Sequence, residues 1–460
     1  MNTLRPLYAL PLIISGAAGA QDQIETQLDD RKASEIEIVG HVLQPAKTSP
    51  SLDQLRLPAG FEVSVFAEAL GNPRMIAVSD NGTVYVTRQK TGDVLMLRDT
   101  DGDGQADEQR VVANRPNMHG IAIDGDTVYL VTIQDLYRTQ IQQDGSFAPL
   151  ERLLDDLPDA GQHPNRTLVV GPDKALYVSV GSTCNSCSEN NPENATLLKV
   201  KPDGSARKVF ASGLRNTIGF GFEPETGRLY GMDHGTDWLG DNVQHEELNL
   251  IREGQRYGWP YVYDDGKPNP ADAPPAGITH EQWAQRSINP VGLYVPHAAP
   301  MQMAFYSGQQ FPAQYRGDAF IAMRGSWNRR PPSGYELVRI RFENSRPVAF
   351  EPFMSGFVSQ QGEQWTRSAR LAGVAQAGDG ALLVSDDEGG SIYRISYSAE
   401  AAAGNEPVEL TPTNPEGAWV GMLDDQQLDA PQRPPRSEKL STELLEHQGP
   451  DLQVSSPAFQ

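Results

Sequence analysis

Five stretches of this sequence repeat one pattern: an apolar strand, a turn rich in Asp and Gly, and a second aliphatic or aromatic strand. Turns of this kind are typical of β-hairpins. The five copies are IAVSDNGTVYVT from Ile76, IAIDGDTVYLVT from Ile121, LVVGPDKALYVSV from Leu168, FGFEPETGRLYGM from Phe220 and VAQAGDGALLVSD from Val374. A degenerate sixth copy runs from Met303 to Arg324.

A further strand with a basic or polar end follows the hairpins, as VLMLRD does from Val94 and IYRISY from Ile392. The early copies recur at a spacing typical of propeller blades, whereas insertions separate the later ones. Because one blade cannot bury both of its faces, blades pack side by side in a ring around a central channel. The sequence therefore predicts an all-β fold, a six-bladed β-propeller with loop insertions over residues 56–397, with almost no helix.

The two ends of the chain differ from the repeats. Residues 1–20 have a basic start, an apolar stretch and Ala18-Gly19-Ala20, which predicts a cleaved signal peptide and a periplasmic or secreted protein. Residues 21–55 are polar and contain Pro, so we expect a leader or linker there. Residues 398–460 are polar, Pro-rich and acidic, which predicts a disordered tail.

The charge of the chain excludes some partners. Sixty acidic against 38 basic residues give a formal net charge of -22, which argues against nucleic acid or an anionic membrane surface as a partner. Beyond the signal peptide, no apolar run approaches the length of a membrane span. The sequence also lacks GxSxG, HExxH, P-loop and GxGxxG motifs, so hydrolase, nucleotide and dinucleotide-binding functions have no motif support.

The chain has two cysteines, Cys184 and Cys187, in STCNSCSE. A single CxxC is a poor zinc site, and without a following His it is not a haem attachment site. In an oxidising compartment we expect a local disulfide that constrains a loop. A redox role for the pair is the alternative.

An acidic segment, DTDGDGQAD, lies between the first two repeats. The spacing of Asp99, Asp101, Asp103 and Asp107 matches the first part of a calcium-binding loop. The bidentate Glu expected at the twelfth position is replaced by Arg110. The segment predicts a structural calcium site, and an acidic turn that faces water is the alternative.

The stretch from Gly213 to Tyr261 combines an Arg-Asn pair with an acidic, Gly-containing loop over residues 233–247. Carboxylates and backbone carbonyls are the ligands that calcium prefers. A guanidinium, an amide and a cation in one strand-loop-strand unit are suited to a polyanionic planar ligand. The alternative is that the acids of this loop are solvated and the arginine is paired structurally.

Basic side chains stand at equivalent positions of several repeats. His163 and His119 precede the first strand of their repeats, as do Arg215 with Asn216 and Arg370 in theirs, and Arg324 ends a strand of the degenerate copy. In a propeller these positions converge on the axial mouth. A neutral His there is a candidate general base, His163 before His119. Three converging arginines repel one another unless an anion lies among them, so the sequence predicts an anionic ligand.

Several motifs resemble the soluble glucose/sorbosone dehydrogenase family, whose members use pyrroloquinoline quinone (PQQ). They are GLRNTIGF, YGMDHGTD and EELNLIREGQRYGWPY in the central stretch. FIAMRGSWNRRPPSGYELVRI and LLVSDDEGGSIYRISY are similar to the sorbosone dehydrogenase branch in particular, as is STCNSC. The resemblance covers residues 57–397.

The resemblance implies PQQ over the axial mouth, with a calcium ion on the quinone. His163 matches the family's base, which takes the proton of the sugar hydroxyl while hydride passes to the quinone. Arg215 and Asn216 match a pair that contacts PQQ and the reacting oxygen. Gly235 and Thr236 match loop carbonyls that hold the calcium.

Arg370 matches an arginine that contacts the carboxylates of PQQ in the family. Arg324 falls near a lysine that makes the same kind of contact. The Arg-Asn-Pro-Gln of the family is Arg215-Asn216-Thr217-Ile218 here, so one polar contact to glucose is lost. The sequence therefore leaves the sugar undefined.

The sequence as a whole predicts a PQQ- and calcium-dependent oxidoreductase that oxidises a sugar hydroxyl or a sugar aldehyde. Electrons would pass to an external acceptor, a cytochrome or a quinone, because the chain has no haem motif. A non-catalytic, calcium-stabilised propeller that binds glycan or protein is one alternative, but it needs no base such as His163. A calcium-dependent propeller lactonase is another, but its acids would stand at the strand starts.

Overall fold

The computed structural model describes residues 43–46, 50–159, 161–404, 410 and 420–423. The predicted signal peptide, most of the leader and most of the tail lie outside the described residues. None of the helices in the described part is both long and apolar enough to span a bilayer.

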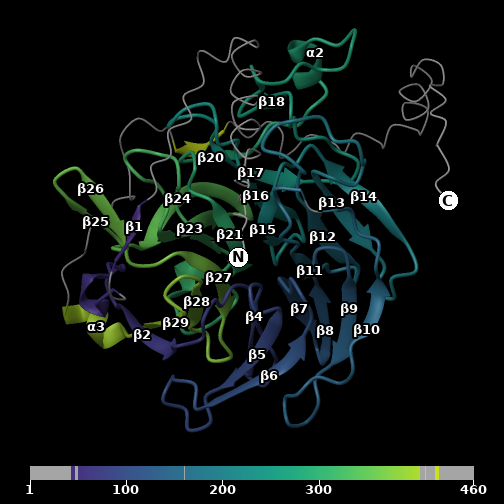
Figure 1. Ribbon diagram of the computed structural model, residues 1–460. Helices are drawn as coiled ribbons and strands as arrows, with labels where there is room; N and C mark the ends of the chain where they lie inside the picture. Colours follow the sequence, from purple (N-terminus) through teal and green to yellow (C-terminus); the bar gives the residue numbers. More distant parts are fainter. Residues whose placement is uncertain (1–42, 47–49, 160, 405–409, 411–419, 424–460) are drawn as a thin grey trace, which may run out of the picture.

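Six antiparallel β-sheets form a ring, which confirms the predicted six-bladed propeller (Figure 1). In blades 1 to 5 the strands follow the sequence outwards, and in all six blades the innermost strand packs against the neighbouring blades. Every hairpin of the sequence repeat, including the degenerate one, supplies the two inner strands of a blade.

The first three blades have four strands each. Blade 1 consists of β3 (Ile76–Val78), β4 (Val84–Arg88), β5 (Asp93–Arg98) and β6 (Glu108–Asn114). Blade 2 consists of β7 (Gly120–Asp124), β8 (Thr127–Val131), β9 (Leu136–Gln140) and β10 (Glu151–Leu154). Blade 3 consists of β11 (Leu168–Val170), β12 (Leu176–Val180), β13 (Thr196–Val200) and β14 (Arg207–Ser212).

The last three blades carry the insertions and the closure. Blade 4 consists of β15 (Thr217–Phe222), β16 (Leu229–Asp233), β17 (Glu246–Ile251), β20 (Gly292–Tyr294) and β30 (Gly421–Met422). Blade 5 consists of β21 (Pro300–Phe305), β22 (Ala319–Met323), β23 (Glu336–Glu343) and β24 (Arg346–Met354). Blade 6 consists of β27 (Leu371–Gln376), β28 (Leu382–Asp386), β29 (Ser391–Tyr397) and β2 (Phe61–Ala67).

The outermost strand of blade 6 comes from the other end of the propeller domain. Strand β2 pairs antiparallel with β29, with Phe61 opposite Tyr397 and Val65 opposite Tyr393. This pairing joins the first and last strands of the domain and closes the ring by backbone hydrogen bonds. The repeat pattern did not identify this strand as part of the last blade.

Two short segments outside the predicted propeller, one in the leader and one in the tail, pair with its strands. Within residues 21–55, β1 (Gln44–Pro45) pairs with β26 (Gln364–Arg367) beside β25 (Val358–Gln361), and a 3-10 turn, η2, covers Leu52–Gln54. Within residues 398–460, β30 adds a fifth strand to blade 4. The remaining elements are β18 (Val262–Tyr263), β19 (Lys267–Pro268), α2 (His280–Ala284), η3 (Ala313–Tyr315) and α3 (Ala399–Gly404).

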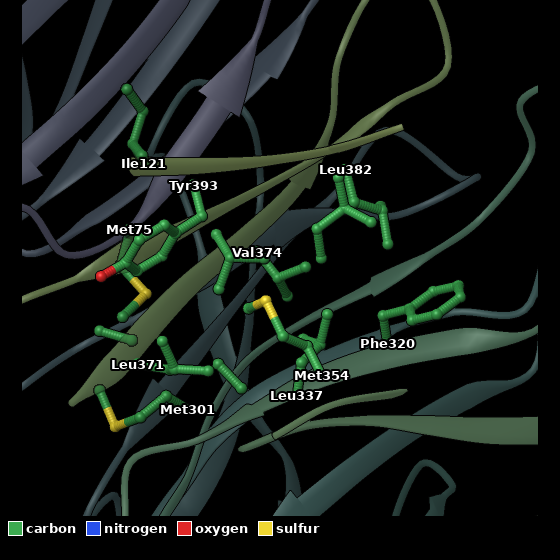
Figure 2. Packing of buried hydrophobic residues seen from close by; sticks show 14 of the residues in the cluster. Met75, Ile121, Met301, Phe320, Leu337, Met354, Leu371, Val374, Leu382 and Tyr393 are labelled. Atoms are coloured by element: carbon green, nitrogen blue, oxygen red, sulfur yellow. The ribbon is translucent and has the colours of Figure 1, made fainter. Parts of the chain in front are cut away.

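Apolar side chains between adjacent blades form the core. In Figure 2, Leu337 and Met354 of blade 5 lie beside Val374 of blade 6, and all three are fully buried. Alternation along the strands gives each sheet two apolar faces, so each blade packs against both of its neighbours. Removing this surface from water is the main term that stabilises the ring.

Glycines allow the inner strands to approach one another. A Cβ on Gly219 of β15 would lie 1.9 Å from the carbonyl oxygen of Met301 on β21. A Cβ on Gly373 of β27 would lie 2.1 Å from the carbonyl oxygen of Arg74, just before β3. Any larger residue at these two positions would separate the blades at the axis, where the starts of the inner strands converge.

Candidate functional site

A cavity of about 300 Å³ lies where the inner strands begin. Six of the predicted site residues line it: His163, Asn216, Arg215, Gly235, Arg324 and Arg370. His297 and three residues of the 233–247 loop also line it: His234, Asp237 and Glu246. The structure adds three residues that the sequence did not single out: Arg74, Asn165 and Trp327. Thr236 is buried beside Gly235 and does not line the cavity.

His163 is a neutral imidazole, and one of its ring nitrogens is hydrogen-bonded to the backbone. Its Nδ1 lies 2.8 Å from the carbonyl oxygen of Ser182, so Nδ1 carries the proton and donates it. Its Nε2 has no hydrogen-bond partner among the described residues and is left as an acceptor on a residue that lines the cavity. Burial, reinforced by the charge of Arg215, lowers the pKa of His163 to about 3.

His119, the weaker candidate base, is not part of the cavity wall. Its Nδ1 donates to the carbonyl oxygen of Arg166 at 2.9 Å, and its Nε2 accepts from Arg74 Nε at 3.0 Å. Burial and the neighbouring Arg74 lower the pKa of His119 well below its usual value. Both ring nitrogens are used, so His119 orients Arg74 and has no nitrogen left to act as a base.

Asp233 fixes the Arg215–Asn216 turn. Its Oδ2 accepts from the Arg215 backbone N–H at 2.7 Å, and its Oδ1 accepts from the Asn216 N–H at 2.7 Å and from Thr217 Oγ1 at 2.8 Å. Burial raises the pKa of Asp233, while these hydrogen bonds oppose the rise. The carboxylate thus sets the direction in which both side chains leave the start of β15.

The cationic part of the cavity contains Arg74 in addition to Arg324 and Arg370, two of the three predicted arginines. Asp387 Oδ2 accepts from Arg74 Nη1 at 2.6 Å and from Arg324 Nε at 2.9 Å. Arg370 donates to the carbonyl oxygens of Arg324 and Gly325 and has no carboxylate partner among the described residues. Burial, with repulsion from Arg324, lowers the pKa of Arg370 to about 10. Two guanidiniums therefore share one carboxylate, and the third, that of Arg370, bonds only carbonyl oxygens.

The predicted calcium-binding carbonyls lie in the turn after β16. Gly235 N–H donates to Glu246 Oε2 at 3.0 Å, and Thr236 N–H donates to Gln244 Oε1 at 3.1 Å. Neither carbonyl oxygen accepts a hydrogen bond from the described part of the chain. The buried hydroxyl of Thr236 also has no partner there.

The acids of the 233–247 loop are not solvated, so that alternative is wrong for three of them. Asp233 ends β16, and Glu246 and Glu247 begin β17, all buried. Glu246 accepts from the backbone N–H groups of Gly235 and Ala299, and burial raises its pKa to about 8. The backbone donors of neighbouring turns compensate these carboxylates in place of water.

The acidic segment between β5 and β6 is separate from the cavity. Carboxylates of Asp99, Asp101 and Asp107 lie within 4.8 Å of one another, as one cation would require. Asp103 does not join them: its Oδ1 accepts from the Gln105 N–H at 2.7 Å. Calcium at this segment remains a prediction for the three.

Cys184 and Cys187 form a disulfide in the loop after β12. Ser182, whose carbonyl oxygen bonds His163 Nδ1, also donates its Oγ to the Cys184 carbonyl oxygen at 2.7 Å. As half-cystines they do not offer thiolates to a metal.

Comparison with known proteins places this geometry in a family. The model of the TrAA12-like family matches residues 55–398. The chain belongs to the TrAA12-like family. An uncharacterized protein of Borreliella burgdorferi is 26% identical over 360 residues, which cover 75% of this chain and 91% of that protein. A pyrroloquinoline quinone-dependent sugar dehydrogenase of Hypocrea jecorina is 25% identical over 297 residues, which cover 54% of this chain and 69% of that protein.

Solved structures agree on the fold. The holo pyranose dehydrogenase PQQ domain of Coprinopsis cinerea superimposes with a TM-score of 0.64 at 20% identity, covering 77% of this chain and 100% of that domain. The calcium structure of the Trichoderma reesei AA12 enzyme gives a TM-score of 0.63 at 21% identity, covering 77% of this chain and 99% of that one. These matches agree with the resemblance found in the sequence. The narrower sorbosone dehydrogenase branch stays a prediction.

Proposed function

We propose that this TrAA12-like protein is a PQQ- and calcium-dependent dehydrogenase that oxidises a sugar hydroxyl or a sugar aldehyde and passes electrons to an external acceptor. One observation carries the proposal: a neutral His163 with an available Nε2 lies in the same cavity as four arginines. A base and an anion site in one cavity are what a bound acidic redox cofactor and an alcohol substrate require.

The residues fit PQQ, a planar cofactor with three carboxylates. Among the described residues, Asp387 is the only carboxylate partner of Arg74 and of Arg324, and Arg370 has none, so this part of the cavity wall has an excess of positive charge. Guanidiniums bind carboxylates through charge-assisted, often bidentate hydrogen bonds. These three arginines would hold the cofactor.

The residues also fit a calcium ion. Calcium takes oxygen ligands, backbone carbonyls among them. The carbonyl oxygens of Gly235 and Thr236 accept no hydrogen bond from the described residues, and buried Thr236 Oγ1 has no partner there either. Buried oxygens without partners are costly unless something binds them, so these two residues would hold the ion.

The residues of the cavity would each have a separate role in the reaction. His163 Nε2 accepts the proton of the sugar hydroxyl, while the Ser182 carbonyl holds the opposite ring nitrogen and fixes the tautomer. Bound PQQ would supply the acceptor for the hydride that leaves the sugar carbon. Arg215 and Asn216 line the cavity and donate to the oxygen on which negative charge develops. An aldehyde reacts in the same way through its hydrate.

Trp327 supports a carbohydrate as the substrate. It lines the cavity, yet 42% of its surface is exposed, which is unusual for a tryptophan in this structure. An aromatic face at the rim of a polar site packs against the apolar face of a sugar ring. The names of relatives, a sugar dehydrogenase and a pyranose dehydrogenase, support the same class. The sorbosone dehydrogenase-like motifs make sugar aldehydes the first compounds to assay.

The test is reconstitution. The mature protein, purified without PQQ, is given PQQ and calcium, and dye reduction is followed across aldoses and sugar aldehydes. We expect turnover only when both are added. The variant His163→Ala should lose about a hundredfold to ten-thousandfold in kcat, the usual contribution of a general base.

The matched control is His280→Ala on helix α2, whose imidazole bonds the Asp272 carbonyl and does not line the cavity. It should keep wild-type kcat. Absence of PQQ binding at saturating calcium would overturn the cofactor assignment and favour a glycan- or protein-binding propeller. Hydrolysis of lactones, followed by acid release, that needs calcium but no PQQ would favour a lactonase.

We also propose that the protein is exported to the periplasm or the medium. The Cys184–Cys187 disulfide supports this, because disulfides persist in oxidising compartments. N-terminal sequencing of protein from those fractions should begin at Gln21, whereas material that starts at Met1 would contradict a cleaved signal peptide.

A further inference from the structure

We propose that the disulfide loop Cys184–Cys187 is a positioning element for the active site, in which Asn185 holds the guanidinium of Arg215. This inference rests on the proposed function for its catalytic consequence. The geometry itself is a property of the protein without cofactor.

Asn185 makes the closest contacts to the Arg215 guanidinium. Arg215 Nε donates to the Asn185 backbone carbonyl at 2.8 Å, and Nη2 donates to Asn185 Oδ1 at 2.6 Å. Asn185 alone thus accepts hydrogen bonds from two nitrogens of the same guanidinium. Both side chains are almost completely buried.

The remaining contacts of this guanidinium are longer. Nη1 lies 3.4 Å from the His234 carbonyl oxygen, and Nη2 lies 3.4 Å from Asp237 Oδ2. Hydrogen bonds weaken towards this distance. Asn185 therefore determines the direction of the Arg215 side chain more than the carboxylate does.

Asn185 also ties the loop to the segment expected to bind calcium. Its Oδ1 accepts a second hydrogen bond, from the Asp237 backbone N–H at 3.1 Å. Its buried Nδ2 has no partner in the described part of the chain. Only the oxygen of the Asn185 amide therefore makes hydrogen bonds, and the carboxylate of an aspartate, which has the same shape, would accept the same two.

The disulfide explains how a loop can hold a buried arginine. Residues 181–195 form neither helix nor strand, so no backbone ladder fixes Asn185. The Cys184–Cys187 bond closes the chain around it. Cross-linking so few residues contributes little to global stability through chain entropy, which leaves local order as its main effect.

The same loop reaches the candidate base. The Ser182 carbonyl accepts from His163 Nδ1, and Ser182 Oγ donates to the carbonyl of Cys184, the first half-cystine. The loop therefore connects His163 on one side with Arg215 on the other. Its order sets the relative position of the two groups that act on the sugar hydroxyl.

Four variants test the proposal. Asn185→Ala removes the side-chain acceptor, Asn185→Asp keeps an acceptor of the same shape, and the double variant Cys184→Ala/Cys187→Ala opens the loop. Ser186→Ala is the matched control, because that side chain contacts Asn269 and Asp272 and not Arg215. Each is examined without cofactor and after loading with PQQ and calcium.

The first readout needs no cofactor. In the apo protein, an Arg215 whose Nη2 is held by Asn185 Oδ1 should give a slowly exchanging Nη2–H resonance, assigned by its absence in Arg215→Lys. We expect this signal to persist in Asn185→Asp and Ser186→Ala and to vanish in Asn185→Ala and the double cysteine variant. Persistence of the signal in the last two would overturn the proposal, whatever the protein binds.

The second readout is the dissociation constant of PQQ, measured by equilibrium dialysis. For each variant, kcat and KM are measured as well. Loss of a charged hydrogen bond should weaken PQQ binding about tenfold in Asn185→Ala. Asn185→Asp should restore it, and the thermal midpoint should change little in any variant. If wild type binds no PQQ, the proposed function fails, while the resonance still decides whether the loop positions Arg215.

Discussion

Asp387 is a buried carboxylate between two guanidiniums, and it leads to a prediction at the scale of single residues. Its side chain is fully buried, and it bonds Arg74 at 2.6 Å and Arg324 at 2.9 Å. Asp387→Asn leaves the arginines of the cavity without this compensating charge. We expect the free energy of unfolding of the apo protein to fall by about 3–5 kcal/mol, the usual cost of breaking a buried pair.

Urea unfolding at constant pH measures this change. The control is Glu151→Gln, which removes a carboxylate that is 58% exposed and bonded to Arg138. Surface pairs contribute about 0–1 kcal/mol, so the control should stay near wild type. Equal losses in the two variants would contradict the view that Asp387 stabilises a concentrated positive charge.

The pH dependence of activity is a second prediction for single residues. Burial and Arg215 lower the pKa of His163 to about 3, so the neutral form, which accepts a proton, predominates above that value. We expect kcat/KM with saturating PQQ and calcium to stay level from pH 7 down to pH 5. A histidine with the ordinary pKa of about 6.5 would instead cause roughly a 25-fold fall over this range. An acidic limb centred near pH 6.5 would show that His163 is not held as described.

Local motifs identify some of the site residues and not others. His163, Arg215, Asn216 and Arg370 were predictable, because each stands at the same place before a repeated hairpin. Arg74 also stands at such a place, but its importance depends on Asp387, which lies 313 residues away in the sequence. Pairing over such a distance leaves no local pattern, so the buried charge network appears only in three dimensions.

At the scale of elements, strand β2 makes the ring closure testable. Phe61 on β2 contacts the rings of Phe311, Phe353 and Tyr397, at centroid distances of 4.7, 4.8 and 5.1 Å. Phe61→Ala should lower the free energy of unfolding by about 3–5 kcal/mol, as is usual for a buried Phe. Ser64→Ala, an exposed position of the same strand, should change it by less than about 0.5 kcal/mol.

Denaturant unfolding of the two variants shows whether β2 closes the ring or only pairs at the edge of blade 6. If Phe61→Ala loses less than about 1 kcal/mol, β2 is a dispensable edge strand and the ring is held by the contacts between blades. A large loss with an unchanged denaturant slope indicates that blade 6 and the ring unfold together.

The elements were predictable where they repeat. Each inner hairpin has an Asp/Gly turn between two apolar strands, so six blades follow from the sequence without any knowledge of their contacts. The partner of β29 was not predictable, because β2 has no hairpin turn and its alternation would suit any sheet edge. The pairing of β30 with blade 4 was not predictable either, because a strand of two residues is too short to show an alternating pattern.

At the scale of the whole molecule, two opposite charges act on anything that approaches the mouth. The chain has a formal net charge of -22, whereas the cavity is lined by four arginines. At low ionic strength the field of the whole protein extends about 30 Å, and salt reduces this to about 10 Å at 0.1 M. The long-range field therefore governs encounter, and the arginines act only on a ligand that has already entered.

This contrast predicts which external electron acceptors react fastest. With saturating PQQ and calcium, the second-order rate constant for hexaammineruthenium(III), a cation, should fall as salt rises from about 10 mM to 200 mM. The constant for ferricyanide, an anion, should rise over the same range. Each acceptor is compared only with itself, so differences in redox potential do not enter.

If ferricyanide instead reacts faster at low salt, the arginine-lined mouth dominates the encounter, and an anionic partner becomes the better candidate for the physiological acceptor. If the cationic acceptor behaves as expected, the search for that partner begins among basic electron carriers, since their charge complements the net negative charge of the protein.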